Sequence, residues 1–277
     1  MPPKLGVIAG GGSLPGRIVR GCQDAGREVF VIALEGHAEP GGFDDVPHAW
    51  LRIGAGGKAL KLLREEGVEE LVFAGDVRRP SLSELKPDLW TAKFLARAGN
   101  KALGDDGMLG AVIRELEASE GFRVVGTESL LPGLLATAGV YGSVQPDGQA
   151  VQDIERGVEV ARGIGGLDVG QAAVVQKGLV LAVEAIEGTD AMIGRAGALR
   201  REGPGGVLVK VSKPGQEARA DLPCIGPETV CAAAEAGLAG IAVEAGGALV
   251  LAQDELVRAA DAAGLFVIGV PVRGGAA

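Results

Sequence analysis

Short apolar runs alternate with amphipathic stretches through the first half of the chain. The run Leu5–Ala9 leads into Gly10–Ser13, a helical pattern follows from Pro15 to Ala25, and a second apolar run spans Glu28–Leu34. This alternation predicts a Rossmann-like, doubly wound parallel sheet in a domain at residues 1–130. Further strands are expected at Ala49–Ile53, Leu71–Ala74 and Phe122–Val125, and further helices at Gly57–Glu66, Leu89–Ala98 and Met108–Ser119.

In the second half, sequence patterns typical of hairpins are mixed with those of helices. This pattern predicts a second, smaller α/β domain with a mixed sheet at residues 151–277. Two strands joined at Lys177–Gly178 form an expected hairpin, and a second hairpin is expected around Ala245–Gly247. Pro and Gly residues between 131 and 150 predict a linker. The other expected elements are helices at Val151–Ile164 and Pro227–Ala236 and strands at Val207–Val211 and Leu265–Val270.

Composition narrows the class of protein. The 277 residues are 47% hydrophobic and only 3% aromatic, so the cores are expected to consist of Val, Ile, Leu and Ala. A net charge of -9 argues against a nucleic-acid surface. The three cysteines, Cys22, Cys224 and Cys231, have no metal-ligand spacing, which favours a reducing compartment. No apolar run reaches the roughly 20 residues of a membrane span.

The segment from Lys210 to Thr229 has the composition of an anion site. Lys210, Lys213 and Arg219 lie within a dozen residues of one another, and Asp221 follows as an isolated carboxylate. Fixed cations beside one acid suit a phosphorylated substrate that is held and hydrolysed. An ordinary exposed loop is the alternative.

Two loops at predicted strand ends are candidates for phosphate binding. Gly11, Gly12 and Ser13 lie at a strand-to-helix turn, where Ser13 is placed to cap the helix and Pro15 suits its first turn. Pro15 replaces the third glycine of a dinucleotide fingerprint, so an NAD site is not favoured. Asp76 and Arg78 follow the strand Leu71–Ala74 and are expected to face this loop.

Acidic residues after the strand Leu179–Val183 suggest a cation site. Glu184, Glu187 and Asp190 could hold Mg²⁺ at a strand-to-helix corner, with helix capping by Thr189 as the rival explanation. His37 and His48 lie near no candidate nucleophile, which argues against a catalytic triad. The candidate chemistry is therefore metal-assisted hydrolysis.

These motifs resemble, nearly end to end, the UDP-2,3-diacylglucosamine pyrophosphatases of the LpxI type. The resemblance rests on the order and spacing of six segments: Leu5–Pro15, Gly75–Pro80, Asp168–Gln171, Val180–Asp190, Lys213–Glu217 and Asp221–Gly226. It implies Mg²⁺-dependent hydrolysis of UDP-2,3-diacylglucosamine to UMP and 2,3-diacylglucosamine 1-phosphate, in lipid A biosynthesis. The family's catalytic aspartate falls on Asp221.

The resemblance and the residue chemistry together define an expected site. Substrate would be bound by Gly11, Gly12, Ser13, Asp76, Arg78, Gln171, Thr189, Lys210, Lys213 and Arg219, and Mg²⁺ by Glu184, Asp190 and Asp221. A nucleotide-dependent oxidoreductase or transferase and a non-catalytic nucleotide-sugar-binding regulator remain alternatives. The oligomeric state stays open, with a homodimer as one option.

A lipid substrate implies an apolar surface and a transient contact with the inner membrane from its cytoplasmic face. The segment Leu130, Leu131, Leu134 and Leu135 and the helix with Trp90, Phe94 and Leu95 are the candidates, although their spacing also suits a core.

Overall fold

The chain forms two compact units in a computed structural model that describes residues 2–78, 85–99, 105–215, 219 and 222–272. Unit 1 comprises residues 1–132 and the short return segment 219–221, and unit 2 comprises residues 133–218 and 222–277. The sequence therefore changes from one unit to the other three times: after residue 132, after residue 218 and after residue 221.

Unit 1 contains a parallel sheet with the strand order β3-β2-β1-β4-β5. The order reverses between β1 and β4, as expected for a doubly wound sheet. Its strands are β1 (Leu5–Ala9), β2 (Val29–Leu34), β3 (His48–Leu51), β4 (Glu70–Ala74) and β5 (Arg123–Val124), and its helices are α1 (Leu14–Asp24), α2 (Gly56–Glu65), α4 (Leu89–Ala98), α5 (Asp105–Ala118) and α6 (Thr127–Leu130).

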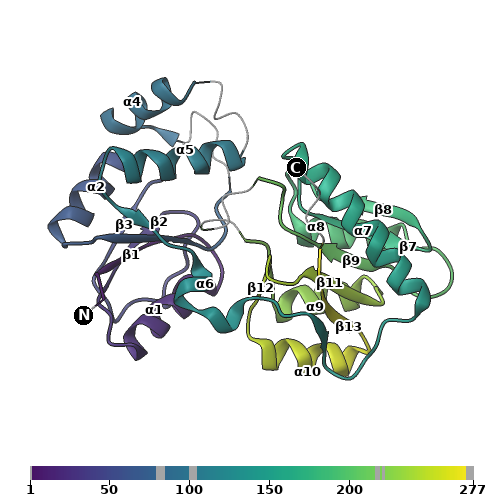
Figure 1. Ribbon diagram of the computed structural model, residues 1–277. Coiled ribbons are helices and arrows are strands. Elements are labelled where there is room, and N and C mark those ends of the chain that lie inside the picture. Colours follow the sequence, from purple (N-terminus) through teal and green to yellow (C-terminus); the bar gives the residue numbers. More distant parts are fainter. Residues whose placement is uncertain (1, 79–84, 100–104, 216–218, 220–221, 273–277) are drawn as a thin grey trace. The chain divides into compact units, whose positions relative to one another are not determined.

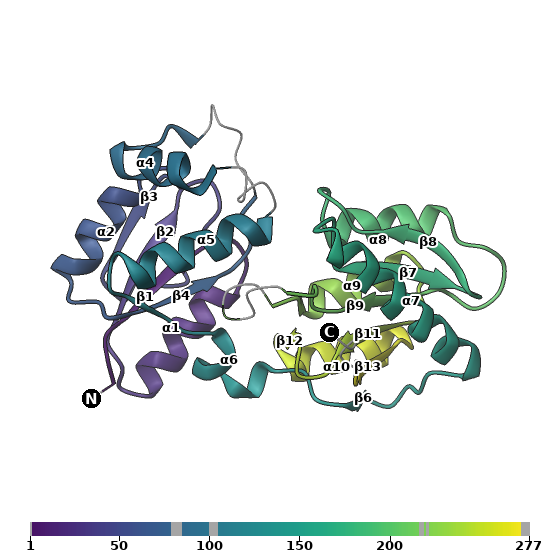
Figure 2. The same ribbon diagram turned by 45° about the horizontal axis from the view of Figure 1, so that its top comes forward.

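Helices cover both faces of this sheet, because the central strands are apolar on both sides. Every residue of β2 is buried, which is the pattern of a strand inside a two-sided parallel sheet. Figures 1 and 2 show α1 on one face and α2 and α5 on the other. The core under α2 and α5 includes Leu60, Leu63, Ile113 and Leu116.

Unit 2 contains a six-stranded mixed sheet with the order β6-β13-β11-β9-β7-β8 in the described part of the chain. The pairs β9–β11 and β11–β13 are parallel, whereas β6, β7 and β8 pair antiparallel with their neighbours. Its strands are β6 (Gly139–Tyr141), β7 (Ala172–Gln176), β8 (Leu179–Val183), β9 (Val207–Lys210), β11 (Gly240–Glu244) and β13 (Phe266–Val270).

Successive residues of these strands enter two different cores. On one face Val207 and Val209 of β9 pack with Ile154 and Ala161 of α7 (Gly148–Gly166). On the other face Leu208 packs in a core formed by three helices. These are α8 (Thr189–Ala198), α9 (Pro227–Glu235) and α10 (Gln253–Ala263). The unit is thus a three-layer α/β structure (Figure 1).

The predicted hairpin around Ala245–Gly247 is wrong. Both neighbours of β11 are parallel to it, and β12 (Leu249–Val250) pairs instead with β10 (Cys224–Ile225) in a separate two-stranded parallel sheet. The hairpin at Lys177–Gly178 is confirmed, with positive φ at both turn residues.

The segment predicted as a linker is largely integrated into unit 2. A short 3-10 helix at Pro132–Leu134 is followed by β6, which pairs antiparallel with β13. The Ala136 N–H also donates to Ala248 O at 2.8 Å, and the Tyr141 hydroxyl lies 2.6 Å from the Thr137 nitrogen. Pro and Gly residues here shape turns of a packed edge strand, so their density does not mark a free linker.

Candidate functional site

The carboxyl ends of β1 and β4 meet at the point where the strand order of unit 1 reverses. Open α/β sheets bind ligands at this position. The loop Gly10–Ser13 follows β1, and the loop Gly75–Arg78 follows β4. The two loops are hydrogen-bonded to each other, because the Gly11 N–H donates to Asp76 O at 2.8 Å and the Asp76 N–H donates to Gly11 O at 3.1 Å. The predicted proximity of these loops is therefore confirmed.

Two glycines are required for this close approach. A Cβ on Gly10 would lie 2.5 Å from Asp76 O, and a Cβ on Gly75, where φ is +87°, would lie 2.3 Å from Gly11 O. Gly12 also has a positive φ of +80°, but it is exposed and a Cβ there would meet nothing within 4 Å. Gly12 is therefore an accessible position of the loop, whereas Gly10 and Gly75 serve the junction between the loops.

Ser13 does not cap α1 through its side chain. It is the N-cap residue, but its backbone is in the right-handed helical region and its hydroxyl makes no capping hydrogen bond, so the predicted cap is wrong. Pro15 occupies the first turn, as predicted. Ser13, Asp76 and Arg78 are all exposed at this edge of the sheet.

His37 belongs to this junction, although its sequence context gave no reason to include it. Its Nε2 lies 3.1 Å from Arg78 O, its Nδ1 lies 3.2 Å from Glu35 O, and its carbonyl oxygen lies 3.1 Å from the position of a Cβ on Gly11. The residue thus links the turn after β2 to the loops after β1 and β4. No local motif signals it, because the contacts depend on strand order.

The topology of unit 2 brings most of the remaining predicted residues to one edge of its sheet. Lys210 ends β9, and its partner in the antiparallel strand β7 is Ala172, directly after Gln171. Because β8 is antiparallel to β7, Glu184 at the end of β8 reaches the same edge. Residues almost 40 positions apart in sequence are therefore neighbours.

These residues form one hydrogen-bonded chain, which we call the Glu184 chain: Gln171, Glu184, Thr189 and Lys210. The Gln171 N–H donates to Glu184 Oε2 at 2.9 Å, and the Thr189 hydroxyl donates to Glu184 Oε1. Lys210 Nζ donates to Thr189 Oγ1 at 2.8 Å and to Cys224 O at 3.2 Å. Glu184 and Lys210 are buried, and Gln171 Oε1 is buried with no hydrogen-bond partner in the described part of the chain. The rival explanation of Thr189 as a helix cap is wrong, because Gly188 is the N-cap of α8.

Lys213 lies on the segment that leaves the same edge. Its Nζ lies 2.9 Å from Asp168 Oδ1, and Asp168 has a positive φ of 54° in the turn between α7 and β7. Next to it, Glu244 at the end of β11 accepts hydrogen bonds from the Ser212 N–H at 2.8 Å and the Ser212 hydroxyl at 2.6 Å. Ser212 and Glu244 were missed by sequence reasoning. A carboxylate at the end of a buried strand was the available signal for Glu244.

Arg219 belongs to unit 1 and not to the Glu184 chain. Its Nη1 lies 2.7 Å from Glu117 Oε1 and 3.3 Å from Val124 O. Asp221, the predicted catalytic residue, lies outside the described residues, as do Arg79, Pro80, Gln216 and Glu217 of the quoted motifs.

Of the three predicted Mg²⁺ ligands, the structure describes only Glu184 and Asp190. Both oxygens of Glu184 already accept hydrogen bonds, and the Lys210 ammonium is one hydroxyl away. Asp190 is exposed in the first turn of α8. Within the ranges that the structure covers, no three His, Cys, Asp or Glu side chains are grouped closely enough to hold a metal ion.

The helix proposed for lipid contact, α4, has one buried aromatic side chain and a second that packs against the core of unit 1. Phe94 is buried, and Trp90 stacks on it with ring centroids 5.6 Å apart and donates from Nε1 to Glu120 Oε1. Leu131 packs over Gly21 of α1. Among the described residues, the most exposed large apolar side chains are Leu89, at the start of α4, and Leu167 and Ile186 in unit 2. Every helix in the described ranges is too short or too polar to cross a membrane.

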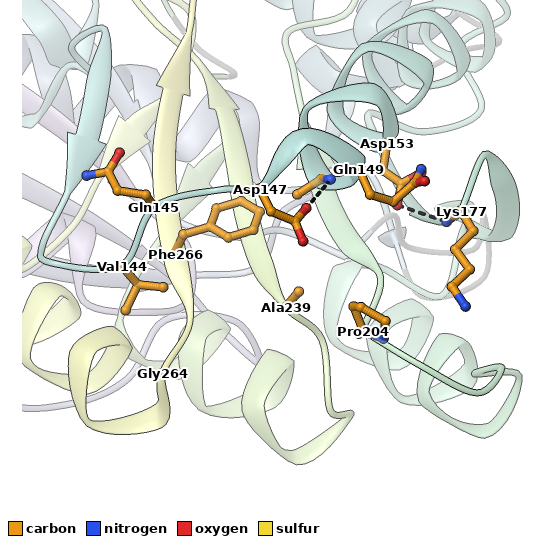
Figure 3. A pocket seen from close by; sticks show the side chains of 12 residues that line it. Val144, Gln145, Asp147, Gln149, Asp153, Lys177, Pro204, Ala239, Gly264 and Phe266 are labelled. Carbon is orange, nitrogen blue, oxygen red and sulfur yellow. Dashed lines mark hydrogen bonds between the residues drawn. The ribbon is translucent and has the colours of Figure 1, made fainter.

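A cavity of about 200 Å³ lies at the opposite edge of the unit 2 sheet, near the starts of β9, β11 and β13 (Figure 3). Both carboxylates in its lining are engaged in local structure: Asp147 caps α7, and buried Asp153 accepts the N–H groups of Lys177 and Gly178 at 2.9 and 2.7 Å. None of the predicted site residues lines it. The Glu184 chain is therefore the stronger candidate for function in unit 2.

Comparison with known proteins covers both units. Residues 4–134 match the LpxI N-terminal domain, and residues 137–268 match the LpxI C-terminal domain. A protein of Caulobacter vibrioides called "UDP-2,3-diacylglucosamine pyrophosphatase LpxI" is 46% identical over 276 residues, which is 96% of this chain and 97% of that protein.

A solved structure, "CobK precorrin-6A reductase", has a TM-score of 0.36 and 13% identity to this chain, covering 100% of this chain and 90% of that one. The two domain matches and the relative, by contrast, span nearly the full sequence at a level that defines a family. The chain belongs to the LpxI family.

Proposed function

We propose that the protein hydrolyses the pyrophosphate bond of UDP-2,3-diacylglucosamine, releasing UMP and 2,3-diacylglucosamine 1-phosphate in lipid A biosynthesis. The observation that carries this proposal is the similarity to the Caulobacter pyrophosphatase, which extends over 96% of the chain. Both domains of the family are present, so the comparison covers the whole described site.

The edge of the unit 2 sheet that carries the Glu184 chain, which we call the polar edge, supplies groups suited to a diphosphate. Lys210 and Lys213 place two ammonium groups there, and each can donate to phosphate oxygens. Lys213 is paired with Asp168, which lies in a turn beside the site, so the incoming anion would compete with this carboxylate for the lysine. Preorganised cations stabilise charge that develops on the oxygens of the phosphorus under attack.

Asp221 is proposed to accept a proton from the attacking water. The water oxygen bonds to one phosphorus, the bridging P–O bond breaks, and the bridging oxygen leaves with one of the two products. Attack at the β-phosphorus would leave the water oxygen on the sugar phosphate. Hydrolysis in ¹⁸O-water followed by mass spectrometry of both products would locate the label and so identify this phosphorus.

We also propose a requirement for Mg²⁺, which would neutralise diphosphate charge when bound. The proposal is supported by the charge of the substrate. The described residues contain no group of three metal-binding side chains, and the predicted ligand Asp221 lies outside them. Activity that is lost in EDTA and restored by added Mg²⁺ would support this requirement. Full activity in EDTA would exclude it.

The acyl chains of this substrate call for an apolar contact and a transient approach to the inner membrane. Leu167 and Ile186, at 77% and 99% exposure, lie on the turns before β7 and after β8. These turns lie at the polar edge of unit 2, so the two side chains are the better candidates for acyl contact. Replacing both with Ser should raise KM for the diacylated substrate more than for a deacylated analogue.

The decisive experiment incubates the purified protein with UDP-2,3-diacylglucosamine and Mg²⁺ and measures UMP by liquid chromatography and mass spectrometry. Release of UMP by the wild type and its loss in Asp221→Asn would support the proposal. Binding without turnover would favour the regulator, and a change in nicotinamide absorbance would favour the oxidoreductase.

A further inference from the structure

Glu184 is the branch point of the Glu184 chain. It follows β8 directly and is only 7% exposed, although it carries a carboxylate. One oxygen accepts the Gln171 N–H, and the other accepts the Thr189 hydroxyl. A buried carboxylate is costly unless its oxygens are paired, so both contacts are needed to keep Glu184 in place.

In the Glu184 chain, only one assignment of hydrogen-bond donors and acceptors is consistent. An ionised carboxylate can only accept and an ammonium can only donate. The Thr189 hydroxyl has one proton, which goes to Glu184, so its lone pairs face Lys210 Nζ. Glu184 thereby fixes the rotation of the Thr189 hydroxyl and, through it, one of the three directions in which the Lys210 ammonium donates.

Backbone geometry supports the same arrangement. A Cβ on Gly170 would lie 2.2 Å from Glu184 O, so glycine at this position lets the turn before β7 approach Glu184. The Glu184 N–H also donates to Ala172 O at 2.9 Å. Gln171 is thus held by its backbone N–H, while its buried side-chain oxygen Oε1, which has no hydrogen-bond partner among the described residues, is left for another contact.

We propose that Glu184 is a positioning residue, and not a metal ligand: it orients Gln171, Thr189 and Lys210 toward the diphosphate of the substrate. The proposal rests on the proposed hydrolysis, since it assigns these three residues to the same substrate. It predicts that Glu184 acts on catalysis through its neighbours, independently of Mg²⁺.

The test begins with Glu184→Gln, which keeps the side-chain size but removes the charge and places an amide opposite an N–H or hydroxyl donor. We expect kcat/KM to fall about 10- to 100-fold, as for displacements on the order of 1 Å in a catalytic site. The dependence on Mg²⁺ concentration should stay that of the wild type. Restoration of activity by excess Mg²⁺, or an unchanged kcat/KM, would overturn the proposal.

Matched variants separate positioning from folding. Glu159→Gln changes an exposed glutamate of α7 that is paired with Arg156, and it should leave kcat/KM within about twofold of the wild type. Thr189→Ser keeps the hydroxyl and should retain activity, whereas Thr189→Val should lose as much as Glu184→Gln. The double variant Glu184→Gln/Thr189→Val should lose less than the product of the two single losses, because both break the same chain.

The outcomes also separate this proposal from the function on which it rests. If Glu184→Gln does not fold, the comparison of Thr189→Ser with Thr189→Val still tests the chain, and equal activities of those two would overturn it. An active wild type with an unaffected Glu184→Gln would reject the role of Glu184 alone. A wild type that releases no UMP would reject the proposed function and, with it, this proposal.

Discussion

At the scale of single residues, the loop junction in unit 1 shows which part of a motif is visible in sequence. The glycine run after β1 identifies a turn, but it does not distinguish Gly12, which is open, from Gly10, which is covered by Asp76 O. Gly75 is required because of a contact with Gly11, 64 positions earlier. Such requirements come from strand order, which composition and local spacing do not contain.

The two positive-φ glycines at this junction provide a test. Gly75→Ala should lower the free energy of unfolding by more than 2 kcal/mol, because it combines backbone strain with a clash against Gly11 O. Gly12→Ala should cost only about 1 kcal/mol, because its new methyl group meets no atom. Urea unfolding of both variants measures the difference. Equal losses of stability in the two variants would show that the clash with Gly11 O does not add to the cost of Gly75→Ala.

At the scale of elements, periodicity predicted most strands and helices but not all of their partners. The hairpin β7–β8 follows from Lys177–Gly178 between two apolar runs, and this local signal was sufficient. The run Gly240–Glu244 was paired with the wrong strand, because a buried parallel strand and half of a hairpin have similar sequences. Its continuous apolar character was the signal for a central strand.

Asp153 connects α7 to the turn of the hairpin β7–β8. Asp153→Asn should destabilise unit 2 by about 1–3 kcal/mol, because a buried amide group would face N–H donors that now have a carboxylate acceptor. Glu155→Gln, on the exposed side of the same helix, should change stability by less than about 0.5 kcal/mol. Thermal unfolding of both variants tests this. An unchanged Asp153→Asn would mean that the turn does not depend on its carboxylate.

Asp88 joins the starts of two helices in unit 1. It caps α4 through the Thr91 N–H and accepts the Gly57 and Lys58 N–H groups at the start of α2. Partial burial acts to raise the pKa of Asp88, but the hydrogen bonds from Thr91, Lys58 and Gly57 outweigh it and lower the pKa. The stabilisation is therefore complete above the unfolded pKa of about 4 and is lost as the pH falls through the lower folded pKa.

Asp88→Ala should accordingly destabilise the protein by about 1–2 kcal/mol at pH 7, the range for loss of an N-cap. The difference from the wild type should shrink below pH 4, as the wild-type carboxylate is protonated. Unfolding in urea at pH 7 and at a series of acidic pH values measures it. A difference that is constant with pH would argue against an ionised cap.

At the scale of the whole molecule, most residues of the candidate site could be selected from the sequence, but which of them lie together could not be predicted. Lys210, Thr189, Glu184 and Gln171 were all selected from sequence, and the structure brings them into one chain. Arg219 was selected for the same site but pairs with Glu117 in unit 1. Residue chemistry and the family resemblance together selected these residues, whereas only the order of the strands determines which of them meet.

Integration of residues 135–150 into unit 2 leads to a prediction for proteolysis. Trypsin has no site between Arg123 and Arg156, so a less specific protease such as subtilisin is suited to the test. We expect little cleavage within 135–150, where β6 and Ala136 are hydrogen-bonded to the rest of unit 2, and more around 131–134. Mass spectrometry of early fragments maps the cuts. Preferred early cleavage within 139–150 would instead support the prediction that this segment is a linker.

The return segment 219–221 has a consequence for dividing the protein. A gene fragment that ends at Pro132 encodes almost all of unit 1 but omits Arg219, which pairs with Glu117. The complementary fragment carries Arg219, whose partner Glu117 lies on the other polypeptide. The two halves of the gene are consequently not the two halves of the folded molecule, and neither can be expressed by itself as a complete structural unit.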